Sequence, residues 1–188
     1  MKHTIFPALR LTLVCMVFFM GIYSLVILGG AQLAPGKGKG ETVLVNGKVV
    51  GWKLVGQKFT DDRYFYSRPS AVDYNAAGAG GSNKGPANPD YLQTVKDRID
   101  TFLVHNPGVK KEEIPSDLVT ASGSGLDPNI SAEGAYAQVS RIAGLRKIPV
   151  EKIKGLVVKY IERPFLGMFG TERINVLKLN IALDELKP

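Results

Sequence analysis

The 188-residue sequence has little of the chemistry that metal and catalytic sites need: it contains one cysteine and two histidines. Cys15 stands inside an apolar run, so the rest of the chain can form neither a disulfide nor a thiolate metal site. Structural zinc is bound mainly by Cys and His, and we therefore expect no metal site. His105 stands beside the helix-ending sequence Asn-Pro-Gly at 106–108 and is explained as a surface residue, so we predict no catalytic residue.

The sequence also lacks a concentrated basic stripe. The formal net charge is +7, but Lys and Arg are mixed with Asp and Glu along the chain and are not interleaved with aromatic residues. Surfaces that bind nucleic acid usually gather their positive charge on one face. We therefore expect no nucleic-acid partner.

One long apolar run is present, at 11–31, and it contains no charged residue. A helix of about 20 residues crosses the roughly 30 Å hydrocarbon core of a bilayer, so the run predicts a single transmembrane helix after a short tail at 1–10. The apolar region of a secretory signal is usually only about 7–15 residues long, which favours a permanent anchor. Gly29 and Ala31 leave cleavage after the run open as an alternative.

The orientation of the anchor follows from its flanks. The short, signal-like start favours a cytoplasmic N-terminus and an extracytoplasmic domain, although Lys37 and Lys39 weaken the charge bias. On a helical wheel the smaller residues share one face. Small residues let membrane helices approach closely, so this face is a candidate docking surface for a partner, with a plain anchor as the alternative. The face comprises Val14, Val17, Gly21, Ser24 and Leu28.

A linker rich in Gly and Lys is expected at 32–41. The sequence after it, at 42–188, predicts one soluble α+β domain. Asn46-Gly47 between two β-branched runs predicts a tight hairpin over 42–52. Residues 57–88 are rich in Gly, Pro, Asn and Ser and predict a long irregular segment. Capping and apolar spacing predict helices from Asn88, Ser131 and Pro149. Short strands are expected at 117–121 and, from alternating Leu residues, at 174–183.

Two loops invite functional hypotheses. The run Gly-Gly-Ser-Asn-Lys-Gly at 80–85 lacks the Gly-Lys-Ser/Thr ending of a phosphate loop. Ser122–Gly125, followed by Asp127, stands between the expected strand and the helix from Ser131, where backbone amides could receive an anion; a tight connection is the alternative. A signal-anchored extracytoplasmic hydrolase or binding module with this Ser/Gly-rich loop therefore remains an alternative function.

Five stretches together resemble one family. They are Tyr-Phe-x-Ser-Arg-Pro-Ser-Ala at 64–71, Gly-Gly-Ser-Asn-x-Gly-Pro-x-Asn-Pro at 80–89, Asp-Leu-Val-Thr-Ala-Ser-Gly-Ser-Gly-Leu-Asp-Pro at 117–128, Gln138-Val139 with Arg141, and Asn175-Val176-Leu177. With the N-terminal anchor, these stretches resemble KdpC, the C subunit of the Kdp-type potassium-transporting ATPase.

The resemblance implies a non-catalytic, single-pass subunit in the bacterial plasma membrane. Its implied partners are a K⁺-binding channel-like subunit, a P-type ATPase subunit and a small membrane subunit. The resemblance implies that the chain assembles and stabilises a high-affinity, ATP-driven K⁺ importer. It also implies that the chain acts as a catalytic chaperone, which raises the ATP affinity of the ATP-hydrolysing subunit. ATP is a possible ligand by resemblance only, because an extracytoplasmic domain cannot touch cytosolic ATP. We expect the loops at 64–89 and 117–131 to face a partner through Ser67, Arg68, Ser70, Ser82 and Asn83.

Overall fold

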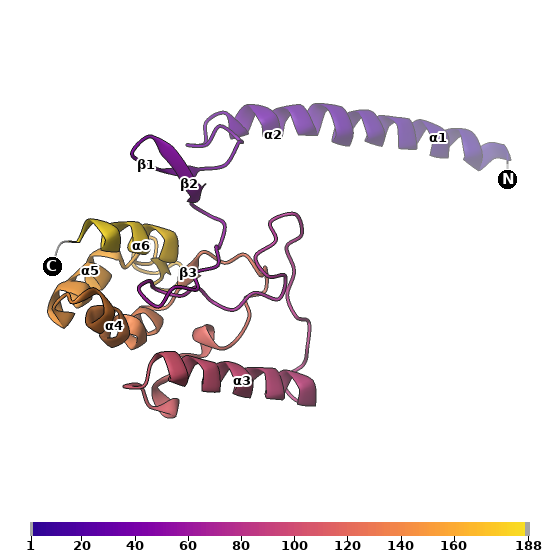
Figure 1. Cartoon of the computed structure of the whole chain (residues 1–188). Helices are drawn as coiled ribbons and strands as arrows, with labels where there is room; N and C mark the ends of the chain where they lie inside the picture. Colours follow the sequence, from indigo (N-terminus) through magenta and orange to yellow (C-terminus); the bar gives the residue numbers. More distant parts are fainter. Residues whose placement is uncertain (1, 187–188) are drawn as a thin grey trace. The chain divides into compact units, whose positions relative to one another are not determined.

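The computed structural model describes residues 2–186 and divides into two units, one ending at Thr42 and one beginning at Val43, which are described separately (Figure 1). The first unit is dominated by one helix formed of α1 (Lys2–Met16), a π-helical segment η1 (Val17–Tyr23) and α2 (Ser24–Ala31). Its candidate membrane span covers Thr4–Ala31. The helix therefore begins before the apolar run at 11–31, and residues 2–10 are helical.

The π segment lies in the middle of the span. The hydroxyl of Ser24 donates to the backbone oxygen of Phe19, five residues earlier, at 3.1 Å. A π turn holds more residues than an α turn, so a straight helical wheel does not describe the face from Val14 to Leu28 accurately. Gly21 lies inside this segment, with no atom within 4 Å of the position a Cβ would take.

The expected hairpin is formed by β1 (Thr42–Val45), which begins at the last residue of the first unit, and β2 (Lys48–Trp52). Asn46 and Gly47 form its turn with φ of 50° and 75°, the positive values that two-residue hairpin turns favour. Residues 57–88 contain no helix or strand, as predicted, yet they are fixed to the domain because Phe65 is completely buried.

The helix predicted from Asn88 is confirmed as α3 (Pro89–His105). The Asn88 side chain accepts a hydrogen bond from the Tyr91 amide, and Pro89 occupies the first turn, where its missing N–H costs nothing. The apolar face of α3 is only partly covered, because Phe102 is buried while Leu92 is 46% exposed.

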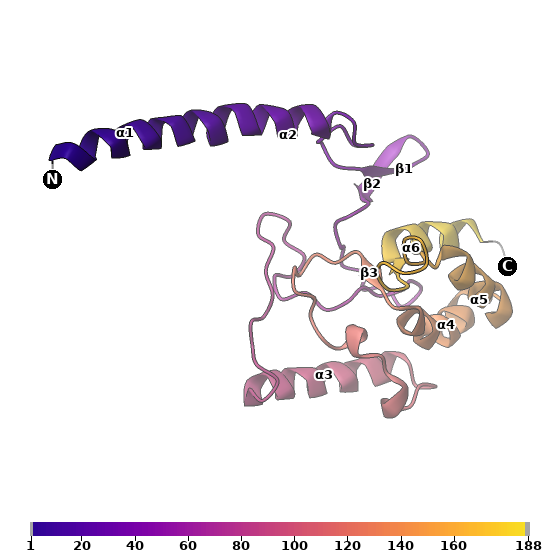
Figure 2. The ribbon, with the colours of Figure 1, turned by 180° about the vertical axis from the view of Figure 1, so that it is seen from behind.

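Three further helices lie side by side and carry most of the core (Figures 1 and 2). They are α4 (Ala132–Arg146), α5 (Val150–Tyr160) and α6 (Val176–Glu185). Ser131 and Pro149 precede the first two helices as predicted, and the Ser131 hydroxyl accepts from the Gly134 amide. Within α4, Ala135 is completely buried while its neighbour Tyr136 is 39% exposed.

The predicted strand at 117–121 is wrong. The chain there begins with a 3₁₀ turn, η3 (Ser116–Leu118), and another 3₁₀ turn, η2 (Lys111–Glu113), precedes it. Both the amide and the hydroxyl of Thr120 donate to the Ser116 backbone oxygen. These two hydrogen bonds close a turn, so the Thr120 amide does not pair with a neighbouring strand. Asp117 also turns its carboxylate onto Ser131, 2.7 Å from the amide nitrogen.

The predicted strand at 174–183 is wrong over most of its length. Only β4 (Ile174–Asn175) is a strand, and it pairs antiparallel with β3 (Asn129–Ile130). Asn175 then caps α6, because its side chain accepts from the Lys178 amide. The alternating leucines mislead because the same sequence also has helical spacing, with buried residues at Val176, Leu179 and Leu183. The mixed α+β class is confirmed.

Candidate functional site

Two of the loops singled out in the sequence interlock in the structure. Arg68 Nη1 lies 3.1 Å from Asp127 Oδ2, and the Ser70 hydroxyl donates to the Gly125 backbone oxygen at 2.7 Å. The Gly80 amide donates to the Ser124 oxygen at 2.8 Å. The segment around 68–80 and the loop at 122–127 therefore form one continuous surface, held by hydrogen bonds between residues far apart in the sequence.

Close backbone approach explains the glycines of this surface. Gly125 has a φ of +68°, and a Cβ at this position would lie 2.7 Å from the Gly80 oxygen and 2.7 Å from a Val72 methyl carbon. Gly81 packs on Gly123 from the other side, with 3.0 Å from its virtual Cβ to the Gly123 oxygen. A side chain at either Gly81 or Gly125 would push the two loops apart.

The Ser/Gly loop uses its polar groups within the chain. Ser122 is 5% exposed and its amide donates to the Pro69 oxygen, while the Gly125 amide donates back to Ser122. The Ser124 hydroxyl accepts from the Leu126 amide at 3.1 Å. These bonds favour the tight connection over an anion-binding loop.

The nearby helix N-terminus is already capped by the chain itself. The amide and hydroxyl of Ser131 bind the carboxylate of Asp117, at 2.7 and 3.1 Å. Because that carboxylate supplies the negative charge that a helix N-terminus attracts, a phosphate would have to displace it.

The remaining sequence candidates divide into two groups. Ser67 is half-buried, and its hydroxyl donates to the Gln57 oxygen at 2.8 Å, which fixes the segment before Arg68. Ser82 and Asn83 are exposed and directly follow Gly81, which packs on the Ser/Gly loop. They therefore border the interlocked surface and present side chains to the solvent.

A groove of about 740 Å³ opens beside the Arg68–Asp127 pair. Its wall carries more acidic than basic side chains, because the only Lys or Arg residues among those lining it are Arg68 and Arg173. Such a surface repels the phosphates of a nucleotide and attracts cations. Its acidic residues are Glu112, Glu113, Asp117, Asp127, Glu133 and Glu172.

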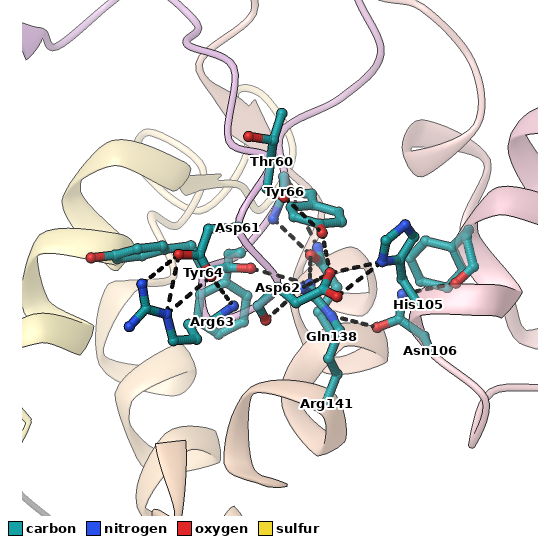
Figure 3. Close-up of polar contacts among 12 residues, drawn as sticks. Thr60, Asp61, Asp62, Arg63, Tyr64, Tyr66, His105, Asn106, Gln138 and Arg141 are labelled. Carbon is teal, nitrogen blue, oxygen red and sulfur yellow. Dashed lines mark hydrogen bonds and ion pairs between the residues drawn. The ribbon is translucent and has the colours of Figure 1, made fainter. Parts of the chain in front are cut away.

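A buried polar network that the sequence analysis did not foresee lies beneath the 62–66 segment (Figure 3). Arg141 of α4 has a side chain only 3% exposed, and its Nε donates to Asn106 at 3.0 Å. Its other nitrogens donate to the backbone oxygen of Asp62 at 2.6 Å and to the Gln138 side chain at 2.8 Å. One guanidinium group therefore joins α3, α4 and the irregular segment.

The network perturbs the ionisation of its members. The hydrogen bond from the Tyr66 hydroxyl lowers the pKa of Asp62, and His105, 2.8 Å away, lowers it further. Burial raises the pKa of Tyr66 to about 12, with the bond to Asp62 acting in the same direction. Burial lowers the pKa of Arg141 from its ordinary value. His105 therefore belongs to this network, bound through its Nδ1 to Asp62.

Two side-chain amides hold the 64–71 motif in place. Asn180 of α6 accepts from the Phe65 amide at 2.9 Å and donates to its oxygen at 3.0 Å. Gln138 of α4 makes the same pair of bonds with Tyr66, at 2.7 and 3.4 Å. Polar residues on the buried faces of apolar helices were the signal in the sequence that could have revealed this clamp.

Comparison with known proteins agrees with this arrangement of motifs. A family model described as KdpC, K⁺-transporting ATPase, c chain, matches residues 5–185. A potassium-transporting ATPase KdpC subunit of Flavobacterium psychrophilum is 61% identical over 183 residues, 97% of this chain and 98% of the relative. The subunit of Bacteroides fragilis is 51% identical over 187 residues, 98% of each chain. That of Caldanaerobacter subterraneus is 50% identical over 189 residues, 100% of this chain and 98% of the relative.

The residues matched by the family model include both the interlocked loops and the clamped 64–71 motif. The sequence resemblance is thereby confirmed over nearly the whole chain. The chain belongs to the KdpC family and is an accessory subunit, not the ATP-hydrolysing one, of a K⁺-transporting ATPase.

Proposed function

We propose that the chain assembles and stabilises a high-affinity, ATP-driven K⁺ import complex of the bacterial plasma membrane. Its partners are a K⁺-binding channel-like subunit, a P-type ATPase subunit and a small membrane subunit. The N-terminus lies in the cytoplasm, and the domain lies outside the membrane. The names of the relatives and the one candidate span found among residues 2–186 support this proposal.

The surface formed by the interlocked segments at 68–80 and 122–127 is the feature that most favours contact with a partner. Long irregular segments in compact domains are usually functional or disordered, and this one is fixed by bonds such as Ser70 to Gly125 and Arg68 to Asp127. Fixing irregular backbone in advance lowers the conformational entropy lost on docking. The exposed edge at Ser82 and Asn83 then contacts the channel-like subunit near the ion entrance.

A bulky substitution at that edge tests the contact. Ser82→Trp adds a large side chain at an exposed position, so we expect the chain to fold but to lose co-purification with the other subunits. Asp100→Trp, on an exposed position of α3, is the matched control and should co-purify normally. Normal co-purification of both variants would contradict the proposed surface.

The orientation can be measured in the linker. Lys39→Cys in a Cys15→Ser background places one exposed thiol after the span. A membrane-impermeant maleimide should label it in intact cells if the domain is extracytoplasmic. Labelling only after the cells are permeabilised would show that the domain lies in the cytoplasm, the opposite orientation.

We further propose that the chain acts as a catalytic chaperone through assembly and raises the ATP affinity of its partner without holding the nucleotide. The internal bonds at 122–125 and the acidic groove beside Asp127 support an indirect effect. The complex should bind ATP more weakly without this chain, while ATP leaves amide exchange at 122–125 unchanged in the isolated chain. Protection of these amides by ATP would instead show direct nucleotide binding.

A further inference from the structure

The domain projects an apolar loop into the solvent. Residues 162–173 fold back on themselves, because Glu162 and Arg173 exchange two backbone hydrogen bonds of 2.8 and 3.1 Å. Four large apolar side chains lie at the tip, each between 63% and 75% exposed. They are Phe165, Leu166, Met168 and Phe169. Such a concentration of exposed apolar surface marks an interaction site more often than an ordinary solvent-facing turn.

The β1–β2 hairpin is the second apolar projection. It is a two-stranded sheet, and such a sheet is only marginally stable in water without something that covers it. Leu44 is 61% exposed and Trp52 is 46% exposed, and Val49, Val50 and Leu54 are exposed as well. Because successive side chains of a strand point to opposite faces, these residues leave apolar surface on both sides of the hairpin.

The two projections start from the same place in the domain. Lys53 and Leu54, which follow β2, line one small cavity together with Glu162 and Arg173 at the base of the 162–173 loop. The Asn175 side chain donates to the Lys53 backbone oxygen at 2.7 Å, which ties the end of the hairpin to β4. The 162–173 loop and the hairpin therefore belong to one end of the domain.

The chain itself keeps that end near a bilayer. The linker at 32–41 joins the membrane span to β1 and reaches at most about 35 Å when fully extended. Its amides at Lys37 and Lys39 donate to Ala34 and Gly36 at 2.8 Å, and these turns shorten it. Exposed basic residues, Lys48 in the hairpin and Arg163 in the loop, suit the anionic headgroups of a bacterial membrane.

We propose that the 162–173 loop and the β1–β2 hairpin dock together on the lipid surface beside the anchor. The aromatic and aliphatic tips enter the boundary between headgroups and acyl chains, while Lys48 and Arg163 stay at the headgroups. This second attachment holds the domain in a fixed orientation on the membrane. The proposal requires an attached anchor but no K⁺ transport, so it and the proposed function can fail separately.

Trp52 is the only tryptophan of the chain and reports directly on this contact. The full chain is reconstituted alone in vesicles of phosphatidylcholine and phosphatidylglycerol whose acyl chains carry bromine, a contact quencher. We expect loss of most of the Trp52 emission, and less loss in pure phosphatidylcholine. Phe165→Asp with Phe169→Asp should restore emission, whereas Val104→Asp, at a 79% exposed position on α3, should not.

Two results would overturn the proposal. Trp52 emission that is typical of water and insensitive to brominated lipid would show that the surface stays in solvent. Trp52 emission that brominated lipid does not quench, but that shifts to shorter wavelength when the other subunits are added, would show that a protein partner covers the surface instead.

Discussion

The guanidinium group of Arg141 lies over the ring of Tyr66, with 4.2 Å between its central carbon and the ring centroid. The two residues are joined again through Asp62, which contacts both the guanidinium and the Tyr66 hydroxyl. One residue comes from a regular helix and the other from the long irregular segment. Their contact is the point at which α4 fixes that segment to the core.

Replacing this arginine should destabilise the domain strongly. Arg141→Ala removes the donor to the buried Asn106 side-chain oxygen and to the Asp62 backbone oxygen, and we expect a loss of about 3 kcal/mol in the free energy of unfolding. Urea unfolding of the full chain in mild detergent, followed by near-ultraviolet circular dichroism, measures it. Arg63→Ala removes an exposed pair with Asp61 and should change little. Equal effects of the two substitutions would refute the role assigned to Arg141.

Alkaline pH should loosen the same network. Burial raises the pKa of Tyr66 to about 12 from an ordinary value of 10.0, so the folded state holds this proton more tightly than the unfolded chain. The resulting stabilisation is complete below the unfolded pKa and is lost as pH rises through the folded one. Tyr74 behaves in the same way, again through burial.

The alkaline effect can be assigned to these two tyrosines. We expect the free energy of unfolding to fall as pH rises beyond 10.0, and the decline to be shallower in Tyr66→Phe and shallowest when Tyr74→Phe is added. An unaltered pH profile in the double variant would contradict the assignment. On the acid side, the lowered pKa of Asp62 contributes stability that is present above the unfolded pKa and is lost as pH falls through the folded one.

The interlocked loops should tolerate alanine at one glycine and reject it at another. Gly125→Ala forces a side chain into left-handed backbone and within 2.7 Å of the Gly80 oxygen, so we expect a loss of more than about 1 kcal/mol. Gly123→Ala is the control, because a Cβ there meets nothing within 4 Å. Equal stability and equal co-purification of the two variants would show that loop contact does not shape the partner surface.

The membrane helix offers a test of the predicted docking face. Gly21 has open space where a Cβ would lie, so Gly21→Leu should insert and fold normally while weakening assembly with the other subunits. Met20→Leu, a change between side chains of similar size at the neighbouring position, serves as the control. Co-purification that is unaltered in Gly21→Leu would reduce the helix to a simple tether.

Local signals predicted much of the fold. Asn46-Gly47 specified the hairpin turn, and Asn88 and Ser131 specified helix starts, because these preferences depend only on neighbouring residues. The pattern at 174–183 failed because its alternation also matches a helix, and the Asn175 cap decided between them. Local preferences fixed these elements only where no long-range contact competed.

The candidate site could be predicted only in part. Family motifs pointed to Arg68, Ser70 and the 122–127 loop, and the structure brings them together. Asp62 and Arg141 are 79 positions apart, and no periodic pattern relates an irregular segment to a helix at that separation. Their network therefore became visible only once the chain had folded.

Growth at limiting K⁺ tests the central claim most directly. A strain that lacks the gene for this chain but keeps those for the other subunits should fail to grow at micromolar K⁺, and should regain growth when the intact gene is returned. The same strain should grow normally when K⁺ is abundant. Normal growth of the deletion strain at micromolar K⁺ would contradict the account.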